Sequence, residues 1–330
     1  MLLSGSTIER ARDRVLAGQL PAGRELLEEV AELPVCELPQ LLALADEIRM
    51  HYCGNGIAVE VLYNAKKGGC SEDCNFCSQS ARYATDVDAE PLSSVEGFLE
   101  AARDAYARGA SELCLVVAVR GPSAKLLERV CTAVKEIKKT YPLHVAVSLG
   151  IMNEAQIGKL LEAGVDKVNH NLETSERFFA DVCTTHTYAE RWATCQLVKK
   201  AGLELCCGGI IGMGESVADR IDFLTALQAL EPQEVPINYL MPQPGTPYQD
   251  RSLVEPTEAL RYIAMARLAL PRALIRFAGG REITLQGLQD LGMRSGASGI
   301  VLGRYLTTAG AADADDFAML ERLGFEVMSS

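Results

Sequence analysis

The sequence predicts one α/β domain in which parallel strands close into a barrel. Short apolar runs alternate with longer segments whose apolar residues recur every three or four positions, as in a parallel sheet with crossover helices. Eight such runs can be counted, which is the number that closes a (β/α)8 TIM barrel. The 330 residues exceed the roughly 250 that such a barrel uses. We therefore predict a (β/α)8 TIM barrel with an N-terminal helical extension, and an open, doubly wound sheet is the alternative.

The sequence pattern of residues 6–50 predicts helices that precede the barrel. Three stretches carry apolar residues at helical spacing, and Pro21 and Pro34 separate them. We expect residues 1–50 to form an N-terminal helical extension packed on the main domain. Residues 51–330 are then expected to form the barrel domain with a C-terminal extension.

The candidate strands follow in order from residue 57. Each is a short run rich in aliphatic residues, and a helical segment follows it. Gly109, Gly164 and Gly202 close helical segments just before a strand, a position where glycine is common. The expected strands are 57–64, 112–119, 143–149, 166–172, 203–211, 234–241, 274–278 and 298–302.

The loop after the first strand holds the strongest chemical signal. Cys70, Cys74 and Cys77 have C-x3-C-x2-C spacing in a short, glycine-containing segment. Thiolates from one such loop predict a site for a soft metal. Three ligands would leave one iron of a [4Fe-4S] cluster open to an outside ligand, which implies chemistry. A zinc site would need a fourth ligand, and none follows in the loop; unpaired cysteines without a ligand role are the remaining alternative.

Composition and charge narrow the class of protein. The chain is 48% apolar and 23% charged, as in an ordinary globular protein. Its net charge of −12 argues against binding to nucleic acid or an anionic membrane. No apolar run is long enough to span a membrane, and the first residues lack the apolar core of a signal peptide, so a cytoplasmic location is expected. The 11 cysteines then favour metal ligands and buried thiols over disulfides.

Polar side chains interrupt several predicted strands, where a packed barrel would otherwise use Val, Ile or Leu. Buried without partners, such groups cost on the order of 1–3 kcal/mol each, and a ligand is one way to supply a partner. A buried cysteine can also act as a small hydrophobe, and an arginine can form a structural ion pair. The residues concerned are Cys114, Asn169, Asn171, Cys206, Asn238 and Arg276.

The cysteine loop, with Phe76 before its last cysteine, resembles the signature of radical S-adenosylmethionine (SAM) enzymes. The wider segment NAKKGGCSEDCNFCSQSARY is similar to that of the biotin synthases within this superfamily. The resemblance covers about residues 40–326, and further segments agree in the same order. They are NHNLETS (169–175), CTTHTYAER (183–191), GGIIGMGES (208–216), PINYLMPQPGTP (236–247), RFAGGRE (276–282) and YLTTAG (305–310).

This resemblance implies a reaction and its cofactors. A [4Fe-4S] cluster on Cys70, Cys74 and Cys77 would pass one electron to SAM, and the resulting 5′-deoxyadenosyl radical would take hydrogen from dethiobiotin. Sulfur insertion would then give biotin. A one-electron reductant such as flavodoxin or ferredoxin, and a homodimer, are implied in the same way.

The resemblance also implies roles for residues around the barrel mouth. The cofactor-binding residues would be Phe76, Asn171, Glu173 and Arg191. The substrate-binding residues would be Asn169, Asn238, Thr307 and Thr308. Without the resemblance, Arg191 would be interpreted as an exposed helical charge, and His170 and His186 are both expected to be structural.

Biotin synthases also hold an auxiliary iron–sulfur cluster inside the barrel as the sulfur source, and Cys114, Cys206 and Arg276 fall at its ligand positions. The commoner form of the family has a further cysteine where this chain has Ala146. Alanine cannot bind iron. We expect an auxiliary cluster of uncertain type, with altered ligation.

Several groups could complete that ligand set. Cys207 follows Cys206, but neighbouring strand residues point to opposite faces, so its use needs a bulge. Cys183 would come closer if its loop folded inward. An external sulfide or thiol is a further candidate.

Two other functions stay open. One is another radical SAM enzyme of the same subfamily that does not insert sulfur, which Ala146 favours. The other is a non-catalytic metal-binding or sulfur-carrier protein, which would leave the polar residues of the barrel face unexplained.

Overall fold

The computed structural model describes residues 6–18 and 20–328 of the chain. Its barrel strands are β1 (Gly56–Lys66), β2 (Glu112–Val117), β3 (His144–Ser148), β4 (Lys167–Asn169), β5 (Glu204–Cys206), β7 (Glu234–Tyr239), β8 (Leu274–Phe277) and β9 (Gly299–Val301). All of them pair in parallel. Because β1 pairs with both β2 and β9, the sheet is closed. This confirms the predicted barrel and excludes the open sheet.

The expected strand at 203–211 is divided in the structure. β5 ends at Cys206, and a separate strand, β6 (Gly209–Ile211), continues the pairing with β7. The chain between β5 and β6 passes close to β7. A Cβ atom at Gly208 would lie only 2.0 Å from the carbonyl oxygen of Pro236 in β7. Only glycine fits there, so the close approach accounts for a glycine at the break.

Other strand boundaries also differ from the prediction, mostly by one or two residues, and one strand was not expected. β4 ends at Asn169, so the expectation that Asn171 lies within a strand is wrong, and this residue belongs to the loop that follows. A short strand near the C-terminus, β10 (Glu326–Val327), pairs with the start of β1 and was not predicted.

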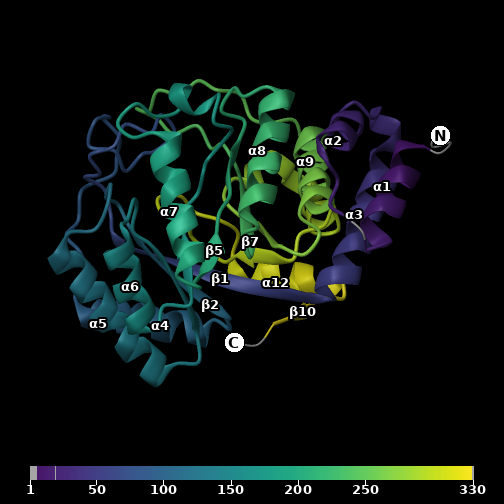
Figure 1. Cartoon of the computed structure of the whole chain (residues 1–330). Coiled ribbons are helices and arrows are strands. Elements are labelled where there is room, and N and C mark those ends of the chain that lie inside the picture. Colours follow the sequence, from purple (N-terminus) through teal and green to yellow (C-terminus); the bar gives the residue numbers. More distant parts are fainter. Residues whose placement is uncertain (1–5, 19, 329–330) are drawn as a thin grey trace.

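Helices cover the outside of the barrel, as the alternating pattern predicted (Figure 1). Five of the longer helices begin at a Ser, Thr or Asn whose side chain accepts a backbone N–H of the first turn. The longer helices are α4 (Val95–Ala107), α5 (Ala124–Thr140), α6 (Glu154–Ala163), α7 (Tyr188–Lys200), α8 (Val217–Leu230) and α9 (Pro256–Ala269). α12 (Asp313–Arg322), near the C-terminus, is as long as α6. The shorter helices are η1 (Val35–Glu37), η2 (Phe179–Asp181), α10 (Arg281–Leu285), η3 (Gln286–Leu288) and α11 (Gln289–Met293).

The N-terminal helices form at residues 6–50 as predicted, and they pack beside α8 and α9 (Figure 1). They are α1 (Thr7–Leu16), α2 (Arg24–Ala31) and α3 (Leu38–Cys53), so α3 runs past residue 50 into the expected barrel domain. The backbone N–H of Ala22 donates to Leu268 in α9 (2.9 Å), and the Gln228 amide in α8 donates to Ala22 (2.8 Å). In the described part of the chain, no helix is both long and apolar enough to cross a membrane.

Charged side chains fill the barrel interior near the start of the strands. We call this set the ionic floor; it consists of Glu60 (β1), Glu112 (β2), Lys167 (β4), Glu234 (β7) and Arg276 (β8). Lys167 Nζ lies 2.9 Å from Glu112 and also contacts Glu234. Arg276 contacts both carboxylates. Because these strands are not all neighbours, the contacts cross the barrel interior. The ion-pair alternative for Arg276 is therefore confirmed.

The carboxyl groups of the ionic floor differ in proton affinity. Burial raises the pKa of Glu60 from 4.5 to about 7, although Arg276 opposes the rise. Burial acts on Glu234 too, but Arg276 and Lys167 outweigh it and hold the pKa of Glu234 well below its usual range. Glu60 Oε1 has no hydrogen-bond partner among the described residues. Glu60 therefore keeps a proton at mildly acidic pH, while Glu234 is ionised.

We predict that Glu60→Gln changes how stability depends on pH. In the unfolded chain Glu60 ionises near 4.5, and in the folded chain only near 7, so its contribution to stability is present at low pH and is lost as pH rises through 7. Between about pH 5 and about pH 8, the wild type should lose on the order of 2–3 kcal/mol that the variant does not lose. Denaturant unfolding at both pH values measures this difference.

The matched control is Glu100→Gln, which removes an exposed carboxyl group and should leave the wild-type pH dependence unchanged. An identical pH dependence in wild type and Glu60→Gln would show that Glu60 titrates normally in the folded chain.

Candidate active site

A cavity of about 370 Å³ opens at the C-terminal ends of the barrel strands. Residues at the strand ends line it, among them Val116, Ser148, Asn169 and Ala278, together with the cysteine loop. Its size is in the range of small-molecule sites, and active sites of such barrels lie at this face. The cavity therefore occupies the position that the predicted fold assigns to the active site.

The three cysteines of the loop all line this cavity. Backbone hydrogen bonds within the loop fix its shape: Cys70 N–H donates to Gln79 (3.0 Å), Ala81 N–H donates to Cys70 (2.7 Å), and Cys77 N–H donates to Cys74 (2.9 Å). The loop thus presents three thiols from one short segment to one space.

The thiols of the loop are neutral before they bind a metal. Burial raises the pKa of Cys70, and it raises that of Cys77 to about 11. A hydrogen bond with Cys183, and then burial, raise the pKa of Cys74. A bound metal must therefore displace the thiol protons. Three soft donors beside an open cavity fit an iron–sulfur cluster that keeps one coordination position for another ligand.

Cys183 lies beside this loop. Its Sγ is 3.2 Å from Asp73 Oδ1 and 3.3 Å from His186 Nδ1. Cys74, Cys183 and His186 bring potential ligand atoms within 4.8 Å of one another. The His186 Nδ1 position, however, already makes a 2.6 Å hydrogen bond to Glu72, so the histidine serves that contact.

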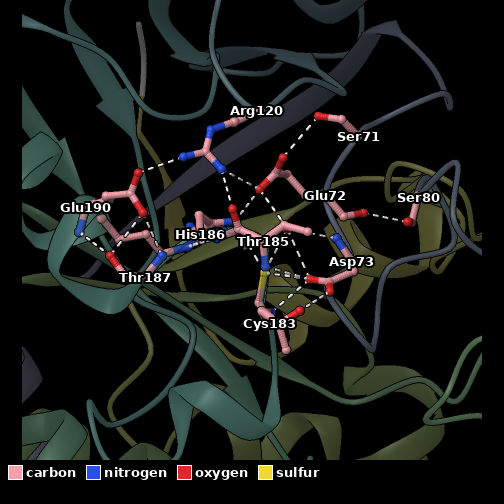
Figure 2. A network of polar contacts seen from close by, with 12 residues as sticks. Ser71, Glu72, Asp73, Ser80, Arg120, Cys183, Thr185, His186, Thr187 and Glu190 are labelled. Carbon is pink, nitrogen blue, oxygen red and sulfur yellow. Dashed lines mark hydrogen bonds and ion pairs between the residues drawn. The ribbon is translucent and has the colours of Figure 1, made fainter.

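A polar clamp joins the cysteine loop to the segment before α7 (Figure 2). Asp73 Oδ1 accepts hydrogen bonds from the backbone N–H groups of Thr184 (2.9 Å) and Thr185 (3.1 Å). Glu72 Oε2 lies 2.6 Å from His186 Nδ1 and 3.2 Å from Arg120 Nη1. These contacts fix the loop to a second part of the barrel mouth. Glu72 and Asp73 were not expected at the site from the sequence, although both stand between the cysteines.

His186 was expected to have a structural role, and the structure shows which side chains it connects. Its Nε2 accepts a hydrogen bond from Arg191 Nε (3.0 Å), while its Nδ1 faces Glu72, so it links the loop to Arg191. His170 also lines the cavity, and its Nε2 has no partner in the described part of the chain. Burial, and then Arg191, lower the pKa of His170 well below its ordinary value, which keeps it neutral.

The expected cofactor-binding residues meet on one side of the cavity. Arg191 Nη1 donates to the carbonyl oxygen of Asn171 (2.6 Å) and lies 3.7 Å from Glu173 Oε1. Asn171 Oδ1 accepts from Gly208 N–H (3.0 Å). The Arg191 side chain is only 13% exposed, so the alternative of an exposed helical charge is wrong. Phe76 lines the same cavity and packs against a small apolar cluster that includes Tyr248.

Glu173 has an unusual backbone. Its φ of 69° lies in the left-handed region, which non-glycine residues seldom adopt. A side chain at Gly209 would lie 2.3 Å from the Glu173 carbonyl oxygen, so close packing holds this conformation. Burial raises the pKa of Glu173, and Arg191 opposes the rise. Such backbone outliers cluster at functional sites, which supports a role for this carboxyl group.

The expected substrate-binding residues line the cavity as well. Asn238 Oδ1 accepts from Gly279 N–H (2.9 Å), and its amide donates to Gly209 (3.2 Å). Thr307 shares a 3.0 Å hydrogen bond with Ser78 beside the cysteine loop, and Thr308 is near Met241. All of these side chains, with Asn169, face the cavity.

The residues expected at the auxiliary site do not all reach the cavity. Arg276 and Glu60 of the ionic floor line it. Cys114 and Cys206 are completely buried and are not among its lining residues. Cys206 Sγ lies 3.5 Å from Glu234 Oε1.

A parallel barrel whose mouth carries this three-thiol loop defines the class of radical SAM proteins, and residues 67–227 match the Radical SAM superfamily. Residues 236–326 match the Biotin and Thiamin Synthesis associated domain. The chain is 46% identical over 320 residues to the biotin synthase of Acidothermus cellulolyticus, covering 96% of this chain and 95% of that protein. It is 45% identical over 314 residues to the biotin synthase of Mycobacterium avium, covering 95% and 91%. The chain belongs to the biotin synthase family.

Solved structures share the fold. Methylornithine synthase superposes with a TM-score of 0.82 at 21% identity, covering 96% of this chain and 97% of its own. The FeFe-hydrogenase maturase HydG from Carboxydothermus hydrogenoformans also gives 0.82, at 15% identity, covering 96% of this chain and 78% of its own. At these identities the likeness establishes the barrel architecture alone.

We predict that Asp73→Ala weakens the clamp. The change leaves the N–H groups of Thr184 and Thr185 without their acceptor, which costs about 1–3 kcal/mol. Thermal unfolding should show a lower Tm, and a chelator should remove iron from the reconstituted variant faster than from wild type. Asp86→Ala, at an exposed position, is the control and should match wild type in both measurements. An Asp73→Ala protein with wild-type Tm and iron retention would contradict the clamp.

Proposed function

We propose that the chain is a biotin-forming radical SAM enzyme that inserts sulfur into dethiobiotin. The observation that carries the proposal is the cavity itself, because three cluster-type thiols and the expected cofactor- and substrate-binding residues line one space. Membership of the biotin synthase family supports this substrate.

The chain's own residues would hold the cofactors as follows. Cys70, Cys74 and Cys77, which line the cavity, would bind a [4Fe-4S] cluster and leave one of its irons for another ligand. The Arg191 guanidinium, already held by His186, would pair with the carboxylate of SAM. When bound, the cluster and SAM supply a carbon-centred radical able to take hydrogen from an unactivated carbon.

The remaining cofactor contacts are those that the resemblance to the biotin synthases implies, and neighbouring side chains support them. Asn171 and Glu173 would bind the ribose hydroxyl groups, because the Asn171 amide lies 3.5 Å from the Glu173 carboxyl group, which lies 3.7 Å from Arg191. Phe76 would lie against the adenine ring, since it lines the cavity and packs against a small apolar cluster.

The substrate would lie deeper in the barrel. The amides of Asn169 and Asn238 would pair with the ureido ring, because each amide can both donate and accept. Asn238 keeps a second N–H and a second lone pair beyond its two backbone contacts. Thr307 and Thr308 would hold the other end of the substrate. Apolar lining residues such as Leu62 and Val301 would keep water from the reacting carbon.

Other parts of the proposal concern partners. A one-electron reductant such as flavodoxin or ferredoxin would supply the electron, and the working form would be a homodimer in the cytoplasm. The second candidate function is a radical SAM reaction without sulfur insertion. Ala146 and the ionic floor favour it, because together they leave the family's auxiliary cluster an incomplete set of ligands.

Product analysis tests the proposal. Anaerobically reconstituted, reduced protein with SAM, dethiobiotin and a persulfide as sulfur donor should form both 5′-deoxyadenosine and biotin. Cys77→Ala should form neither, and Cys36→Ala, at an exposed cysteine, should form both at wild-type rates. SAM cleavage without biotin would favour the reaction without sulfur insertion. No cleavage at all would favour a non-catalytic metal-binding protein.

We also predict that Arg191→Lys weakens SAM binding. Lysine keeps the charge but loses the planar fork and the hydrogen bond to His186, so the Kd for SAM should rise by roughly 10- to 100-fold. Equilibrium binding to the reconstituted protein measures the change, with Arg129→Lys on α5 as the control. An unchanged Kd would remove Arg191 from the cofactor site.

A further inference from the structure

The barrel interior does not provide the ligands of a second iron–sulfur cluster. The family's auxiliary cluster would need donors from several strands, and Cys114, Cys206 and Arg276 stand at those positions, with Ala146 in place of a further cysteine. To bind iron, the side chain at each of these positions must be able to donate a lone pair.

The side chain of Ala146 packs among apolar neighbours. It is fully buried on β3, directly opposite Cys114 on β2. The two residues form a small apolar cluster with Val116, against which Leu62 and Leu306 pack. A methyl group offers iron no lone pair, and these apolar neighbours offer no replacement.

Neither cysteine proposed as a substitute reaches the interior. Cys207 Sγ lies 3.8 Å from Cys195 Sγ on α7, so its side chain points outward between sheet and helix. The break after β5 therefore does not turn Cys207 inward. Cys183 lies at the barrel mouth against Asp73 and His186. Of the candidates considered from the sequence, Cys207 and Cys183 are therefore not placed to complete an interior ligand set.

Arg276 has no nitrogen free to bind iron. Its Nε donates to Glu234, its Nη1 donates to the carbonyl oxygens of Ala58 (3.3 Å) and Ile300 (2.9 Å), and its Nη2 donates to Glu112 and to Glu234 (3.0 Å). These contacts use all five N–H groups of the guanidinium. Burial opposes its charge, but Glu112 and Glu234 outweigh burial and raise the pKa of Arg276 well above its ordinary value. A ligand nitrogen would need the neutral form.

The charge beside the interior thiols does not favour an anionic cluster either. Cys206 Sγ lies 3.5 Å from the carboxyl oxygen Oε1 of Glu234. The ionic floor places three carboxyl groups beside two cationic side chains, so it offers no excess positive charge for an anionic cluster.

We infer that this chain holds one iron–sulfur cluster, at the cysteine loop, and that the ionic floor replaces the auxiliary cluster as a permanent ion-pair network. If the proposed function holds, the inserted sulfur comes from a persulfide, RSSH, that enters the cavity from outside. Two 5′-deoxyadenosyl radicals take the two hydrogen atoms from dethiobiotin, the two carbons bond to the outer sulfur of the persulfide, and its S–S bond breaks to leave the thiol RSH. This consequence rests on the proposed function, whereas the single-cluster inference rests on the barrel interior alone.

Anaerobic reconstitution with excess iron and sulfide tests the inference without relying on activity. Wild type should bind about four iron atoms per chain and show a single type of cluster in its Mössbauer spectrum. The variant Cys70→Ala/Cys74→Ala/Cys77→Ala should bind no iron above the blank. The matched variant Cys114→Ala/Cys206→Ala should keep the wild-type iron content and spectrum. Circular dichroism and thermal unfolding check that each variant is folded.

The inference is overturned if the triple variant retains a cluster, or if Cys114→Ala/Cys206→Ala loses iron while remaining folded. If the triple variant does not fold, the double variant and the wild-type spectrum still show whether a second cluster is present, because such a cluster would add its own spectral component. These iron measurements are independent of biotin formation, so failure of the inference and failure of the proposed function are distinguishable.

Discussion

The structure depends on the ion pairs that Arg276 and Lys167 make with Glu112 and Glu234 across the barrel. Buried charges are stable only when they are paired, so these strands must keep the spacing that lets their side chains meet. TIM barrels usually fill this layer with branched apolar residues. Here the charged side chains of the ionic floor pair with one another, and the side chains of Glu60 and Arg276 form the inner end of the cavity. Its chemistry limits what the interior can bind.

The opposite end of the barrel obeys a different constraint. Three neutral thiols need fixed positions before a metal can replace their protons, and the loop obtains them from its own backbone and from the clamp around Asp73 and Glu72. Through His186, the same clamp orients Arg191. The cysteine loop and Arg191 are therefore connected by one chain of hydrogen bonds through His186.

The barrel and the thiol loop could be predicted because their signals are local: apolar runs of strand length, and three cysteines within one loop. The break after Cys206, the outward position of Cys207 and the ionic floor could not, because they depend on which strands meet when the barrel closes. Glu60, Glu112 and Glu234 look like ordinary polar positions until that closure brings them together. His186 illustrates the same limit, since its two partners come from distant segments.

The most direct test of this account follows the origin of the inserted sulfur. The protein is reconstituted with a heavy sulfur isotope, freed of unbound sulfide, and supplied with SAM, dethiobiotin, a reductant and a sulfur donor of natural abundance. The account predicts that mass spectrometry finds natural-abundance sulfur in the biotin, and little biotin when the donor is omitted. Biotin that carries the heavy isotope, formed without added donor, would contradict it, because the sulfur would then come from a cluster resident in the protein.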